Sequence, residues 1–174
     1  TPTPPLFNAP FPVDFGLFKN RANSSNWRIG ARLISGKRLE CDNNSPEASN
    51  NSFLFDYQNG WYYGSGDVPD IHSWMFKRAP GFFDVVAYSG TGSATTINHN
   101  LTVSPEMMWI KNLNDNESWS VYHKDKGADK NIWLNDSSAG ISSNRFNDTA
   151  PTDSVFSVKT DNATNTSGDD FIAF

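Results

Sequence analysis

The order of apolar and polar residues along the chain predicts β-strands. From Trp27 onward alternate residues are apolar, so that Trp27, Ile29 and Ala31 share one side, and Trp119 begins a second alternating stretch. Clusters of Asn, Ser, Asp and Gly between these stretches have the composition of tight turns. The pattern therefore predicts an all-β fold, an antiparallel sandwich or a jelly-roll-like arrangement. Further strands are expected at residues 82–88, 107–110, 154–158 and 170–174.

A repeated segment is the most informative feature of the sequence. Lys19-Asn20 and Lys111-Asn112 each end an apolar run, and they lie 92 residues apart, as do Trp27 and Trp119. A fixed period indicates one folding unit that is used more than once. We therefore expect two related repeats. The expected parts are a Pro-rich arm or linker at residues 1–12, a first, partial copy at residues 13–80 and a second copy at residues 81–174.

The side of the strand that carries the tryptophan is retained in both copies, which indicates that it faces a hydrophobic core. The residues expected in the core of the repeats are Phe18, Trp27, Trp109 and Trp119. Residues 82–101 precede the second copy but have no counterpart before the first. The first copy therefore either lacks an edge strand or uses residues 82–88 for it. An unpaired strand edge favours pairing with another chain.

Composition and charge narrow the classes of function. The chain of 174 residues has a net charge of −5 and no basic stripe, so we expect no nucleic-acid partner. Its single cysteine, Cys41, excludes an internal disulfide and is interpreted as a small apolar residue. No apolar stretch reaches the roughly 20 residues that a membrane-spanning helix needs, so no membrane insertion is expected.

The stretch Trp61, Tyr62 and Tyr63 follows a predicted turn and is the candidate binding surface. Three consecutive aromatic side chains cannot all point to one face of a strand, and an exposed ring beside amide side chains suits a sugar. We expect these residues to contact a glycan or a neighbouring subunit. In the second case Trp61 and Tyr63 would pack inward, and Tyr62 would lie under the neighbour.

No arrangement of residues in the sequence indicates catalysis or a cofactor. His72, His99 and His123 are far apart and lack the spacing of metal ligands. Asp67 with Asp70, and Asp169 with Asp170, could contribute to a calcium site, but neither pair forms a complete calcium loop. Neither a nucleophile motif nor a singled-out pair of carboxylates is present. We therefore expect a protein without catalytic residues, metal or cofactor.

The second copy resembles an uncharacterised repeat domain of bacteriophage virion proteins, which is frequent in tail-fibre-like proteins of marine phages. The resemblance covers nearly all of residues 81–174. The segments that carry it are Gly81–Gly92, Ile97–Leu101, Met108–Asn112, Ser118–His123, Asn147–Thr152 and Phe171–Ala173. The first copy matches more weakly, because Gly30-Ala31 replaces Tyr122-His123 and the opening strand is missing.

The resemblance implies a structural component of a virus particle, such as a tail fibre, an appendage or a capsid decoration. The unpaired strand edges, the Pro-rich arm and the aromatic surface predict a homo-oligomer. By analogy with phage fibres it would be a trimer, and it would assemble with other virion proteins. A lectin-like adhesion module that binds a host surface glycan is the alternative, and a polysaccharide depolymerase is a third reading.

Overall fold

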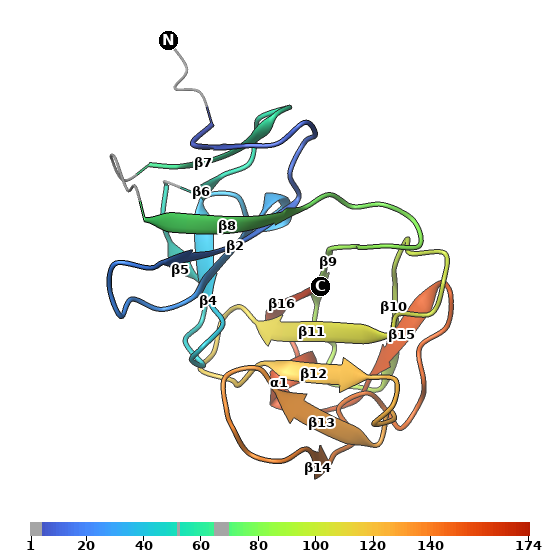
Figure 1. Cartoon of the computed structure of the whole chain (residues 1–174). Coiled ribbons are helices and arrows are strands. Elements are labelled where there is room, and N and C mark those ends of the chain that lie inside the picture. The colour runs from blue at the N-terminus through green and yellow to red at the C-terminus, as the bar shows by residue number, and fades with distance from the viewer. Residues whose placement is uncertain (1–4, 52, 65–69) are drawn as a thin grey trace. The chain divides into compact units, whose positions relative to one another are not determined.

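The computed structural model describes residues 5–51, 53–64 and 70–174, and the all-β prediction is confirmed (Figure 1). Among these residues the helices are one turn of 3-10 helix, η1 (Arg32–Ile34), and the single-turn α1 (Asn162–Asn165). The chain forms two compact units. The first contains the residues up to Cys41 and Glu47–Arg78, and the second contains Asp42–Pro46 and Ala79–Phe174.

The first unit is built from two antiparallel sheets. The larger has the order β5-β4-β3-β2-β8 and the smaller the order β1-β7-β6. The strands of the larger sheet are β2 (Phe15–Asn20), β3 (Arg28–Ala31), β4 (Lys37–Glu40), β5 (Ala48–Ser49) and β8 (Ile71–Phe76). Those of the smaller sheet are β1 (Phe7–Asn8), β6 (Phe53–Leu54) and β7 (Gly60–Tyr63).

The second unit also has a large and a small antiparallel sheet, of order β14-β13-β12-β11-β16-β9 and β10-β15. The strands of the large sheet are β9 (Val86–Ser89), β11 (Met107–Asn112), β12 (Ser120–His123), β13 (Lys130–Trp133), β14 (Ile141–Ser142) and β16 (Asp170–Ala173). The small sheet consists of β10 (Thr95–Asn98) and β15 (Val155–Val158).

Five strands of the two large sheets have the same order and the same register. Phe15 pairs with Ala31 in the first unit, and Met107 pairs with His123 in the second, at positions 92 residues further on. The pairs Arg28 with Glu40 and Ser120 with Trp133 also correspond, although Trp133 lies 93 residues after Glu40. The small sheets also correspond, since Phe7 lies opposite Trp61 and Ile97 lies opposite Phe156.

The cores of the two units are filled differently at matching positions. In the second unit Met108 and Tyr122 are buried in the core, whereas Gly16 and Gly30 take these places in the first. A Cβ atom on Gly16 would lie 2.9 Å from the Trp61 ring. The larger rings of the small sheet therefore occupy the volume that the glycines leave open.

The predicted core contains two errors. Trp27 is 36% exposed, because it precedes β3 and stacks on Trp74 with ring centroids 5.5 Å apart. Trp109 is half-buried and lies outside the core cluster, because Met108 and Ile110 on either side of it point to the core and side chains alternate along a strand. Phe18 and Trp119 are 2% and 0% exposed.

The expected arm at residues 1–12 is also wrong in part. Residues 1–4 lie outside the described residues, but Phe7 and Asn8 form β1 and pair with β7. Phe7 stacks on the Trp61 ring at 4.8 Å, and Ala9 is 8% exposed. This part of the segment therefore belongs to the first unit, because its apolar side chains complete the core.

Candidate functional site

The aromatic stretch expected on the surface begins in the core. Trp61 is 0% exposed, and its indole N–H donates to the Ser73 hydroxyl at 3.1 Å. Tyr62 and Tyr63 are half-buried, and the Tyr63 hydroxyl accepts a hydrogen bond from Arg28 at 3.2 Å. The prediction that Trp61 contacts a glycan is therefore wrong, since Trp61 occupies the place of a core residue between the two sheets.

A different aromatic pair lies on the surface of the first unit. Trp74 is 47% exposed and stacks on Trp27 at an interplanar angle of 29°, and the Lys19 ammonium lies 6.0 Å from the Trp27 ring centroid. Sequence reasoning missed Trp74, because β8 was not among the expected strands. Alternation within β8 would have placed this residue on the same side as Phe76.

Two arginines converge on one carboxylate beside Tyr63. The Arg28 and Arg38 guanidinium groups lie 3.8 Å and 3.5 Å from the Glu40 carboxylate, and the Asn26 amide donates to Glu40 at 2.7 Å. These three charged side chains are only 16–28% exposed. The group carries one excess positive charge, and sequence reasoning had singled out none of its members.

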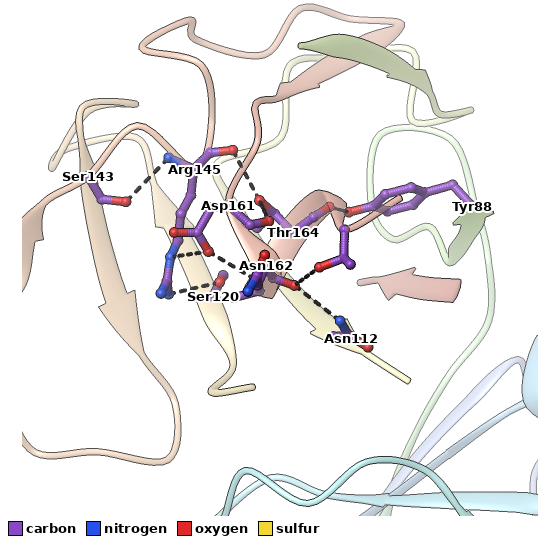
Figure 2. A network of polar contacts seen from close by, with 10 residues as sticks. Tyr88, Asn112, Ser120, Ser143, Arg145, Asp161, Asn162 and Thr164 are labelled. Carbon is purple, nitrogen blue, oxygen red and sulfur yellow. Dashed lines mark hydrogen bonds and ion pairs between the residues drawn. The ribbon is translucent and has the colours of Figure 1, made fainter. Parts of the chain in front are cut away.

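The second unit contains a polar network around Arg145 and α1 (Figure 2). The Arg145 guanidinium lies 3.0 Å from the Asp161 carboxylate and donates to the Ser120 hydroxyl at 3.1 Å. Asp161 caps α1, because its carboxylate accepts the Ala163 N–H at 2.9 Å. The Tyr88 hydroxyl donates to the Thr164 carbonyl at 2.7 Å. The network therefore links α1 to β9 and β12.

The polar groups of this network hold elements of the second unit together. The Asp161 carboxylate is engaged by a guanidinium and a backbone N–H, so it is poorly placed to act as a base. Burial raises the pKa of Tyr88, which keeps its hydroxyl protonated as a hydrogen-bond donor. A surface hollow of about 540 Å³ beside the network is lined by Ser142, Ser143, Asn144 and by the carboxylates of Asp129, Asp148 and Asp161, among others.

We expect Arg145→Met to lower the free energy of unfolding by about 2 kcal/mol, because it leaves the partly buried Asp161 without its cation. Arg21→Met is the matched control. The Arg21–Asp70 pair is 4.0 Å long and its side chains are 62% and 50% exposed, so its loss should change the unfolding free energy by less than about 0.5 kcal/mol. Urea unfolding measures both, and equal effects would contradict the assigned role of Arg145.

The repeated Lys-Asn pair shapes the turn that follows β2 and β11. The Asn20 side chain accepts the Ala22 N–H at 2.8 Å, and the Asn112 side chain accepts the Asn114 N–H at the same distance. The Lys111 ammonium donates to the carbonyls of Asn112 and Asp115 at 2.7 and 3.1 Å. Both turns are thus built by side chains that bond to nearby backbone groups.

Lys111 should make stability depend on pH. Burial lowers its pKa to about 8, although Glu117 and Asp115 oppose this effect. The unfolded chain therefore holds more protons than the folded one above pH 8, and the free energy of unfolding should rise toward pH 10 relative to Lys111→Met. Urea unfolding at pH 7 to 10 measures this difference. Lys126→Met, at an exposed position, controls for the lost charge. A constant difference would contradict the assignment.

The remaining candidate ligands do not gather into a metal site. Among the described residues, no group of three or more His, Cys, Asp or Glu could hold a metal ion. Asp169 accepts from the Asn112 amide at 2.8 Å, and Asp170 accepts from the Ser89 hydroxyl at 2.8 Å. Asp67 lies outside the described residues.

The three histidines lie in different surroundings. His72 is exposed on β8, and His123 lies 3.9 Å from Asp125. The His99 Nδ1 accepts the Leu101 N–H at 3.2 Å, and His99 is 8% exposed and lines a small pocket of about 30 Å³.

Comparisons with known proteins bear on the second unit and on β8 of the first. A family model described as "Domain of unknown function (DUF7483)" matches residues 69–174. No curated protein and no solved structure matches the chain. No helix in the described part of the chain is both long and apolar enough to cross a membrane. Because the family model matches more than half of the chain, the protein belongs to the DUF7483 family, a domain of unknown function.

Proposed function

We propose that the chain is a non-catalytic structural component of a bacteriophage particle, in a tail fibre, an appendage or a capsid decoration. The proposal starts from the resemblance of residues 81–174 to a repeat domain of such virion proteins. Its two units are interpreted as copies of one module that lengthen or space a structure outside the particle's shell.

The observation that best supports this proposal is the shared register of the two large sheets. Strand pairs in the first unit recur in the second at the same relative positions, from β2 with β3 through β4 with β5. Serial use of one β-module builds extended assemblies without a catalytic centre. The carboxylates with clear partners, such as Asp161 and Glu40, are engaged in ion pairs that hold elements together.

The protein should work as a homo-oligomer, most simply a trimer, alongside other virion proteins. Light scattering on the purified chain at micromolar concentration should give three times the monomer mass of 19.4 kDa. A stable monomer would contradict the oligomer.

Electron microscopy tests the location. Antibodies raised against the purified chain should label intact virus particles at a defined position. As a control, antibodies that have first been mixed with an excess of the free chain should no longer label the particles. Recovery of the protein only from the soluble fraction of the infected host would overturn the proposal.

A lectin-like adhesion module is the second candidate, and the exposed Trp27–Trp74 pair favours it. Stacked, exposed indoles provide a flat apolar surface of the kind that sugar rings contact, and the nearby Lys19 ammonium would suit an acidic sugar. Binding on a glycan array that is lost in Trp74→Ala, but retained in Tyr62→Ala, would support this candidate. Release of reducing sugars from a host polysaccharide would instead indicate a depolymerase.

A further inference from the structure

The two large sheets differ at one edge. In the second unit β9 pairs with β16, so that Tyr88 lies opposite Phe171 and Val86 opposite Ala173. In the first unit β8 takes the place of β16, but among the described residues no strand pairs with its outer edge. Residues 86–89 thus serve the second unit. Of the two alternatives for the first copy, the one in which residues 82–88 supply its edge strand is wrong, whereas the one in which it lacks an edge strand agrees with the pairing of the described residues. The large sheet of the first unit is left with one strand fewer than that of the second.

Matching hydrogen bonds identify the backbone groups that face this edge. The Arg21 N–H donates to the Asp70 carbonyl at 2.9 Å, and the Leu113 N–H donates to the Asp170 carbonyl at 2.9 Å. Bonding direction alternates along an antiparallel strand, so His72 and Trp74 direct their backbone groups toward β2. The backbone groups of Ile71, Ser73 and Met75 therefore point outward. The counterparts of Ile71 and Ser73 in the second unit, Phe171 and Ala173, pair with β9.

The side chains at these positions are also less covered in the first unit. Phe171 and Ala173 are 0% and 4% exposed, and the Tyr88 ring stacks on Phe171 with centroids 5.2 Å apart. In the first unit Ile71 and Ser73 take these places and are only partly buried, as is Met75, which packs with Ile71 against the core. An added strand would therefore gain both backbone hydrogen bonds and apolar contact.

We propose that the outer edge of β8 binds an extended segment of another polypeptide that has the pattern of β9, an apolar residue followed two positions later by tyrosine. The segment would run antiparallel to β8. Its tyrosine would lie opposite Ile71, near the Trp61 ring, and its apolar residue opposite Ser73. A second copy of β8 fits less well, because its core-facing residues Ile71, Ser73 and Met75 include no aromatic ring. The edge belongs to the fold itself, so this inference does not depend on a role in a virus particle.

A labelled peptide with the sequence of residues 84–90 tests the proposal against the full chain. Fluorescence anisotropy should show saturable binding, and a peptide in which tyrosine is replaced by alanine should bind about tenfold more weakly. Ile71→Lys places an inward-pointing ammonium at the edge and should also weaken binding by about tenfold or more. His72→Lys is the matched control: it adds the same charge on the other side of β8 and should change binding by less than about twofold.

Hydrogen exchange locates the peptide. Bound peptide should protect the amides of Ile71 and Ser73 and leave those of Phe171 and Ala173 unchanged, since β9 already covers them. Circular dichroism and melting curves should show that both variants are folded. Three results would overturn the proposal: the absence of saturable binding, equal loss of binding in both lysine variants, or protection at β16 through replacement of β9. Self-association that Ile71→Lys abolishes without any peptide would instead identify a second copy as the occupant.

Discussion

Replacing Trp61 with alanine is expected to lower the free energy of unfolding of the first unit by about 3–5 kcal/mol. The indole is 0% exposed and its ring lies within 6 Å of Phe7, Phe18, Phe53 and Phe55. The first unit uses glycine at two core positions opposite this ring system, so little else could move in to fill the cavity. Loss of the indole also removes the donor to the Ser73 hydroxyl.

Denaturant unfolding followed by far-ultraviolet circular dichroism measures this effect. Trp74→Ala is the matched control, because it removes the same side chain from a position that is 47% exposed, and it should cost about 1 kcal/mol or less. The two units can unfold in separate transitions, in which case only the transition of the first unit should shift. A Trp61→Ala effect no larger than that of Trp74→Ala would contradict the assignment of the core.

Gly90→Ala is expected to lower the free energy of unfolding of the second unit by about 3 kcal/mol. A Cβ atom at this position would lie 2.0 Å from the Thr166 carbonyl oxygen and 2.8 Å from the Phe171 ring. The backbone cannot shift easily, because the Gly90 N–H donates to the Asp169 carbonyl at 2.7 Å and the Gly90 carbonyl accepts from the Gly168 N–H at 3.1 Å. The substitution should therefore separate β9 from β16.

Gly168→Ala separates this steric effect from backbone strain. Gly168 has a φ of +87°, which an alanine adopts at a cost of about 1–2 kcal/mol, but nothing lies within 4 Å of the added methyl group. Thermal unfolding of both variants should therefore rank Gly90→Ala as the more destabilising. The reverse order would indicate that the contact between Gly90 and Thr166 is looser than described. Gly90→Ala also tests how much the pairing of β9 with β16 stabilises the second unit. The segment proposed to bind β8 would pair with it in the same way.

Local chemistry allowed several features to be predicted from the sequence. Alternation of apolar side chains and turn residues between them were enough for the all-β class, because both depend on neighbours along the chain. The Lys-Asn pairs marked the ends of β2 and β11, where the asparagine side chains bond to the backbone two residues on. The boundary expected near residue 80 lies close to the change of unit after Arg78.

Contacts between distant residues decided what the sequence pattern could not. Both Trp27 and Trp119 directly precede a strand, but one is 36% exposed and the other is buried. Trp61 belongs to an aromatic stretch that the sequence pattern predicted to be a binding surface, but β1 and the larger sheet enclose its side chain. Periodicity assigns a side chain to a face, whereas only the packing of sheets determines whether that face is covered.

The polar networks and the open edge of β8 likewise depend on tertiary structure. Arg145 and Asp161 carry no motif, and they meet because the segments around them converge on α1. The duplication in the sequence left open whether the first copy lacks an edge strand or uses residues 82–88 for it, and strand pairing determined that β9 completes the second unit and leaves β8 at an edge. Every residue type other than proline offers the same backbone donor and acceptor, so the sequence by itself could not assign this partner.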